Sequence, residues 1–168
     1  MTKTVYILRH AQSPMMGNDD FERPLSDKGF ADMKALGSKM AADGLAPDYC
    51  HCSPAKRTRQ TWRTITQSGV GEVQTDFPEN QYNAPAGTLY ETLTQKTDDR
   101  FSSVAMVAHN PGIYNLAVFL ADKEKMPPEL SMGYQAGTLT VLEFDVERWA
   151  EIMPESGTVT TILIPDQY

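Results

Sequence analysis

Two short, unbroken apolar runs constrain the fold most, at residues 5–8 (VYIL) and 104–108 (VAMVA). A strand that is buried on both faces reads as a continuous apolar run, whereas a half-exposed strand alternates apolar and polar residues. Residues 49–52 (YCHC) form a shorter strand candidate between the two runs. We therefore predict three central, parallel strands that are covered by helices on both faces.

Helical patterns separate these strands. Ser26 is a suitable N-cap for a helix with one apolar face, and three further helices are indicated by apolar spacing at 55–65, 86–93 and 113–120. Two later segments, 138–144 and 159–164, read as strands near a sheet edge. Alternating strands and helices predict a three-layer α/β/α sandwich with a mostly parallel, mixed sheet. The length of 168 residues suits one domain, spanning 1–168.

Charge and composition exclude several classes of partner. Lys and Arg total 15 and Asp and Glu total 22, so the net charge is -7. We expect no nucleic-acid binding, which needs a basic surface, and any anion site must be a local positive pocket. We find neither a secretory signal pattern nor an apolar run that could span a membrane, so we expect no membrane partner. Cys50 and Cys52 are poor disulfide partners at this spacing, which favours a cytoplasmic protein.

The most informative residues follow the three central strands. Arg9 and His10 end the first strand, Arg57 follows the second, and His109 follows the third. We interpret Ser53 and Asn110 as helix caps, each followed by proline at the first helical position. The carboxyl ends of parallel strands meet at one edge of a sheet, where helix N-termini attract anions. These side chains are therefore expected to meet there.

The chemistry of this set points to phosphoryl transfer. Arg9 and Arg57 supply planar donors that match phosphate oxygens, while His10 and His109 supply a nucleophile and a further donor. The set holds no carboxylate cage for Mg²⁺, so we expect no metal and no other cofactor. Taken singly, each residue has an ordinary alternative role, such as a structural histidine or a solvated helix face. A zinc site at residues 50–52 (CHC) is disfavoured, because strand alternation turns His51 away from both cysteines.

Four segments together resemble the histidine phosphatase superfamily, which has the phosphoglycerate mutase-like fold. The segments are 8–11 (LRHA), 53–61 (SPAKRTRQT), His109, and 23–29 (RPLSDKG); the last is similar to short bacterial phosphohistidine phosphatases of the SixA type. The resemblance implies that His10 attacks phosphorus and becomes a phosphohistidine. It also implies that Arg9, Arg57 and His109 hold the phosphoryl oxygens. Arg23 is implied to join the phosphate pocket.

One departure from the family bears on the substrate. Larger members carry a glutamate that protonates an alcohol leaving group, whereas residues 77–83 (FPENQYN) resemble the short branch. Glu79 is the one possible general acid in this segment. A protonated imidazole leaves without such help. We therefore predict a phosphatase that acts on phosphohistidine in a phosphorylated protein. A phosphatase of small phosphate esters is the alternative; a mutase and a non-catalytic phosphate-binding module are less favoured.

Overall fold

A computed structural model describes all 168 residues and contains one six-stranded sheet. The strands are β1 (Lys3–Arg9), β2 (Tyr49–Cys52), β3 (Gln74–Asp76), β4 (Ser103–Ala108), β5 (Leu139–Phe144) and β6 (Thr158–Leu163). Their spatial order is β3-β2-β4-β1-β5-β6. The first four strands of this order are parallel, and β5 is antiparallel to both of its neighbours. The predicted mixed sheet, with the two late strands at one edge, is confirmed, whereas the short edge strand β3 was not predicted.

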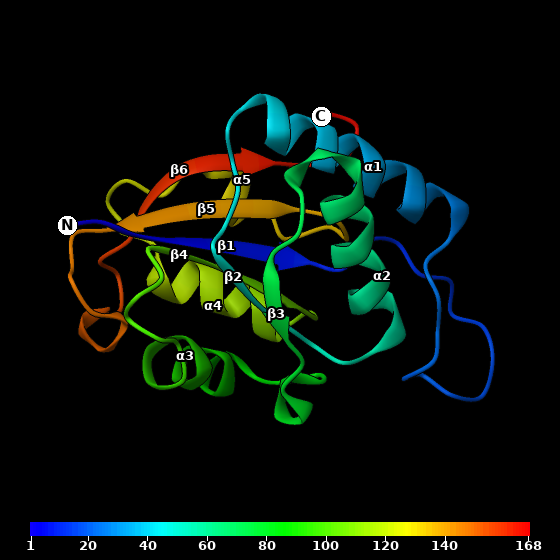
Figure 1. The fold of residues 1–168 in the computed structure, drawn as a ribbon, viewed down its shortest axis with the longest axis horizontal. Coiled ribbons are helices and arrows are strands. Elements are labelled where there is room, and N and C mark those ends of the chain that lie inside the picture. The colour runs from blue at the N-terminus through cyan, green and yellow to red at the C-terminus, as the bar shows by residue number, and fades with distance from the viewer.

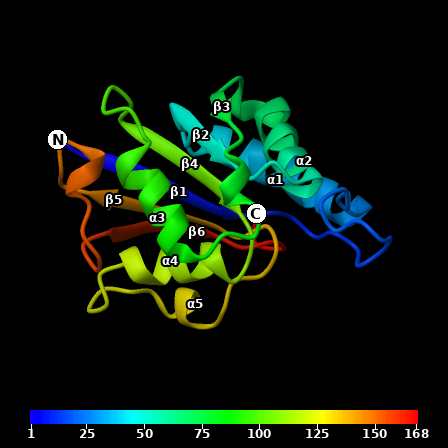
Figure 2. The ribbon, with the colours of Figure 1, turned by 90° about the horizontal axis from the view of Figure 1, so that it is seen from below.

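Helices cover both faces of the sheet. They are α1 (Asp27–Ala42), α2 (Lys56–Ile65), α3 (Ala86–Gln95), α4 (Gly112–Leu120) and the short α5 (Pro128–Ser131). Figure 1 shows α1 above the sheet and α3 and α4 below it, and Figure 2 gives the view from the side of α3 and α4. Helix α2 shares the core of α1, since Trp62 and Ile65 of α2 belong to one apolar cluster with Met33 of α1. The three-layer α/β/α sandwich is therefore confirmed.

The continuous apolar run of β1 has a direct structural cause. Val5 and Ile7 belong to the core between the sheet and α3 and α4, whereas Tyr6 and Leu8 belong to the core beneath α1 and α2. Because successive strand residues point to opposite faces, a strand between two helical layers needs apolar residues at every position. No helix of the structure is both long and apolar enough to cross a lipid bilayer.

The predicted helix caps at Ser53 and Asn110 are wrong. Helix α2 begins after Ala55, and α4 begins after Pro111, which follows a cis peptide bond. Both polar side chains have other partners. Ser53 Oγ lies 2.6 Å from His109 Nε2, and Asn110 Nδ2 donates to the carbonyl oxygen of Tyr134 at 3.0 Å. The cap at Ser26 is present, since its Oγ accepts a hydrogen bond from Gly29 N at 3.0 Å.

Strand register brings the ends of three strands to one level. Arg9 of β1 pairs with Ala108 of β4, and Cys52 of β2 pairs with Val107 of β4. Backbone hydrogen bonds continue one residue further on each strand, from His10 N to Ala108 O at 3.1 Å and from Ser53 N to Val107 O at 2.9 Å. The residues that follow β1, β2 and β4 therefore start from the same edge of the sheet.

Candidate functional site

A cavity of about 480 Å³ lies at this edge. Its lining residues are Arg9, His10, Gln12, Ser13, Met15, Asp20, Arg23, Arg57, Asn83, His109, Asn110 and Ala136. All five residues that the sequence placed around a phosphate are among them: Arg9, His10, Arg23, Arg57 and His109. Glu79 is not. It lies on a short 3-10 helix, Glu79–Gln81, with an exposed side chain.

His10 is held in one orientation by the backbone. Its Nδ1 lies 2.7 Å from the carbonyl oxygen of Ala11, which can only accept, so Nδ1 carries the proton and Nε2 carries the lone pair. The residue is only 8% exposed. Burial, together with the charges of the nearby arginines, lowers the pKa of His10 to about 4 against the opposing effect of the Ala11 carbonyl. The imidazole is therefore neutral at pH 7 and nucleophilic at Nε2.

Ala11, the residue that supplies the orienting carbonyl, is tied to α2 through its backbone N–H. Ala11 N donates to Thr61 Oγ1 at 3.0 Å, and that hydroxyl donates to the Arg57 carbonyl oxygen at 2.7 Å. The neighbouring Gln60 accepts a hydrogen bond from Leu25 N at 2.8 Å through its Oε1. The QT pair at 60–61 therefore joins α2 to both ends of the β1–α1 loop.

Two guanidinium groups come from the end of β1 and the first turn of α2. Arg9 Nη1 donates to the Tyr134 carbonyl oxygen at 2.8 Å. Arg57 is only 3% exposed and donates from Nη1 to the Asp20 carbonyl oxygen at 2.7 Å. The Nε atoms of both arginines are buried and have no hydrogen-bond partner. Unsatisfied cationic donors beside a cavity indicate a site built for an anion.

Arg23 holds the loop between β1 and α1. Its Nε donates to Asp20 Oδ1 at 3.0 Å, and its Nη1 lies within hydrogen-bonding distance of Ser13 Oγ (3.1 Å) and Pro14 O (3.0 Å). A glycine at the start of α1 lets this loop approach, since a Cβ on Gly29 would lie 2.3 Å from the Gln12 carbonyl oxygen. The RPLSDKG segment therefore has a packing role as well as a charge.

His109 faces His10 across the cavity, with ring centroids 5.3 Å apart. Its Nε2 is 2.6 Å from Ser53 Oγ. With the serine hydroxyl as donor, His109 keeps its own proton on Nδ1, a buried atom with no partner. Burial lowers the pKa of His109 to about 3, with a further contribution from His10, so this ring is also neutral at pH 7. Sequence reasoning missed the role of Ser53 because the SP pair resembled a helix cap.

Asp20 and Tyr82 were also missed. The Asp20 carboxylate accepts hydrogen bonds from Arg57 Nη2 at 3.2 Å, from Arg23 Nε, and from the Tyr82 hydroxyl. The Tyr82 hydroxyl and the two arginines hold the pKa of Asp20 well below its usual range, so the group is ionised. In the sequence, Asp20 lies in a polar loop with no periodicity to identify it. Its arginine partners become evident only once the loop is folded.

The sequence cluster at residues 50–52 has a structural role. His51 is buried, with Nδ1 2.7 Å from Asp76 Oδ1 and Nε2 3.0 Å from Thr97 Oγ1. Cys50 and Cys52 are free, buried thiols. No group of three or more His, Cys, Asp or Glu side chains in the structure is arranged to hold a metal ion.

Comparisons with known proteins agree with this geometry. The family model of the histidine phosphatase superfamily (branch 1) matches residues 5–112. An uncharacterised protein of Mycobacterium tuberculosis is 26% identical over 163 residues, which cover 94% of this chain and 99% of that protein.

Two solved structures share the whole fold, and both are described as candidate phosphohistidine phosphatases, SixA. The structure from Nakamurella multipartitia has a TM-score of 0.84 at 24% identity, covering 98% of this chain and 97% of its own. The structure from Agrobacterium tumefaciens has a TM-score of 0.82 at 25% identity, covering 97% of this chain and 98% of its own.

Proposed function

The chain belongs to the histidine phosphatase superfamily, and from its site we propose that it hydrolyses phosphohistidine on a protein through a covalent intermediate at His10. Membership establishes a phosphatase. The geometry of the cavity supports His10 as the nucleophile. The ionised state of Asp20, the one carboxylate that lines the cavity, supports phosphohistidine as the substrate.

In the first step, the lone pair of His10 Nε2 attacks phosphorus. The P–N bond to the substrate imidazole breaks, and its electron pair returns to that nitrogen. A substrate imidazole protonated on its other nitrogen leaves as the neutral ring. His10 becomes phosphorylated on Nε2 and keeps its Nδ1 proton against the Ala11 carbonyl. The donors of Arg9, Arg57 and His109 stabilise the charge on the three equatorial oxygens.

In the second step, water attacks the phosphorylated His10. The P–N bond breaks with its electron pair returning to Nε2, the water proton passes to the phosphate product, and His10 is again the neutral Nδ1–H tautomer. The leaving group is an imidazole that bears a proton on its other nitrogen in both steps. Neither step therefore requires a group that donates a proton to the leaving nitrogen.

The observation that carries the substrate class is the state of Asp20. It is the one Asp or Glu side chain that lines the cavity. Hydrogen bonds from Tyr82, Arg23 and Arg57 keep it ionised, so it has no proton for an alkoxide. This favours cleavage of a P–N bond over cleavage of an alkyl phosphate. The SixA descriptions of the structural relatives point to the same substrate class.

A reducing, cytoplasmic location is part of the proposal. The thiols of Cys50 and Cys52 are both free and buried, which suits a compartment where disulfides do not form.

The test compares turnover of a phosphohistidine peptide with turnover of a panel of small phosphomonoesters, all in excess chelator. We expect the phosphohistidine peptide to have the higher kcat/KM and the chelator to have no effect. A preference for a monoester would overturn the substrate assignment and favour the small-ester phosphatase. Loss of activity with the chelator would overturn the metal-free mechanism.

A further inference from the structure

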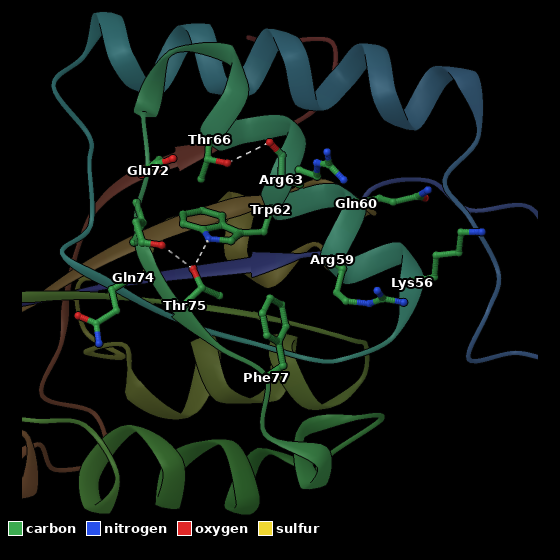
Figure 3. Close-up of a pocket in the computed structure, with 11 residues that line it drawn as sticks. Lys56, Arg59, Gln60, Trp62, Arg63, Thr66, Glu72, Gln74, Thr75 and Phe77 are labelled. Atoms are coloured by element: carbon green, nitrogen blue, oxygen red, sulfur yellow. Dashed lines mark hydrogen bonds between the residues drawn. The ribbon is translucent and has the colours of Figure 1, made fainter.

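A second cavity of about 870 Å³ lies outside the catalytic site, between α2 and β3 (Figure 3). One wall consists of side chains from successive turns of α2 and from Thr66, which follows it. The other consists of the edge strand β3 and residues on either side of it. The lining residues are Lys56, Arg59, Gln60, Trp62, Arg63, Thr66, Glu72, Val73, Gln74, Thr75 and Phe77. We call this cavity the α2–β3 groove.

The α2–β3 groove is positively charged, although the whole chain carries a net charge of -7. Lys56, Arg59 and Arg63 line it and take part in none of the eleven ion pairs of the structure. Arg59 uses its Nε for the Pro54 carbonyl oxygen at 2.8 Å, which leaves both terminal nitrogens free. Glu72 is the one carboxylate on the lining. Unpaired cations along one groove attract an anionic partner.

The groove starts beside the catalytic site. Lys56 directly precedes Arg57, whose side chain lines the catalytic cavity, and Lys56 N donates to the Phe21 carbonyl oxygen at 2.9 Å. From Lys56 to Arg63 the helix rises about 10 Å, at roughly 1.5 Å per residue. An extended chain covers that length with about three residues. A peptide with its phosphohistidine in the catalytic cavity can therefore run into the groove.

The wall opposite the cations offers a different kind of contact. Phe77 is 46% exposed, and its ring lies at the groove in Figure 3. Trp62 is almost fully buried and is fixed by a hydrogen bond from Nε1 to Thr75 Oγ1 at 3.0 Å, so the floor is rigid. The groove can accept an apolar side chain on one wall and carboxylates on the other.

We propose that the α2–β3 groove binds an acidic, extended segment of the phosphoprotein substrate. This proposal rests on the proposed function and adds the chemistry of the partner. Carboxylates of the segment pair with Arg59, Arg63 and Lys56, and an apolar residue packs on Phe77. Two of these cations, Arg59 and Arg63, are exposed and Lys56 is half-buried. Cations at a surface act mainly on association rate and partner choice, and their effect falls as salt rises.

The probes are two synthetic peptides with one histidine, phosphorylated chemically with phosphoramidate. One peptide carries a run of glutamates beside the phosphohistidine, and the other carries glutamines at the same positions. We expect the acidic peptide to have a kcat/KM about tenfold higher at low ionic strength, and the difference to shrink with added salt.

The variant Arg59→Glu/Arg63→Glu should remove this preference and leave the kcat/KM of the neutral peptide within about twofold, since both side chains are exposed and exposed charges contribute little by themselves. The control is Lys34→Glu/Lys96→Glu, which makes the same change of charge at two exposed lysines outside the groove and outside any ion pair. It should retain the preference.

The outcomes separate the two proposals. Equal turnover of both peptides by the unmodified chain, or an equal loss in both variants, would overturn the docking proposal and leave the phosphatase assignment intact. If neither peptide is dephosphorylated while a monoester is, the proposed function fails, and the docking proposal fails with it.

Discussion

His10 Nδ1 lies 2.7 Å from the carbonyl oxygen of the residue that follows it, Ala11. This contact determines which nitrogen can attack. A carbonyl oxygen accepts a hydrogen bond only from a nitrogen that bears a proton, so Nδ1 is protonated and Nε2 is free to attack. The same residue, Ala11, is fixed through its backbone N–H, which donates a hydrogen bond to Thr61 Oγ1 of α2. The nucleophile is therefore oriented by the backbone at the end of β1 and by the helix that also carries Arg57.

The contact between Ser53 and His109 predicts a catalytic loss on Ser53→Ala. The Ser53 hydroxyl lies 2.6 Å from His109 Nε2, and when it donates to that nitrogen the His109 proton sits on Nδ1. We expect kcat to fall about tenfold to a hundredfold with a small change in KM, because the donor acts mainly on developing charge. Steady-state kinetics check this, and nitrogen NMR shifts of His109 should show mixed tautomers in the variant. An unchanged kcat together with unchanged shifts would contradict the assigned role.

Close packing at Gly29 predicts that Gly29→Ala loosens the β1–α1 loop. The added Cβ would lie 2.3 Å from the Gln12 carbonyl oxygen, so the backbone of the loop at Gln12 or of α1 at residue 29 must shift. We expect a loss of about 1–3 kcal/mol in the free energy of unfolding and a raised KM. Gly87→Ala in α3 is the matched control, because its Cβ meets nothing within 4 Å. The control should be neutral or stabilising, and a similar loss in both variants by urea unfolding would refute the packing argument.

Burial of neutral His10 predicts a specific dependence of stability on pH. Its pKa is about 4 in the folded chain, against about 6.5 for an unperturbed histidine. Between these values the unfolded chain binds more protons, so the free energy of unfolding falls as pH is lowered from about 6.5 to 4. His10 alone accounts for about 3 kcal/mol of this loss, at about 1.36 kcal/mol per pKa unit. In His10→Gln the decline should be shallower. Parallel curves for the two proteins in urea unfolding across this range would exclude a buried neutral His10.

The strands that carry the site could be predicted from the sequence, whereas the contacts that loop residues make could not. Apolar runs of β1 and β4 could be identified because both faces of these strands are covered. The short strand β3, with its polar composition, gives no such pattern. Asp20 could not be found, because its function depends on arginines brought to it by the fold of a loop. The sequence around Ser53 is typical of a helix cap, but in the fold its hydroxyl contacts His109, which is distant in sequence.

The most direct test of the account is to identify the phosphorylated atom. The chain is mixed with a phosphohistidine peptide and quenched in alkali, which preserves phosphohistidine. The modified residue is then located by mass spectrometry, and the phosphorus–nitrogen linkage is identified by phosphorus NMR. We predict phosphate on His10 at Nε2, with both the label and the turnover lost in His10→Gln. Turnover that persists in His10→Gln, or phosphate on Nδ1 or on another residue, would contradict the mechanism.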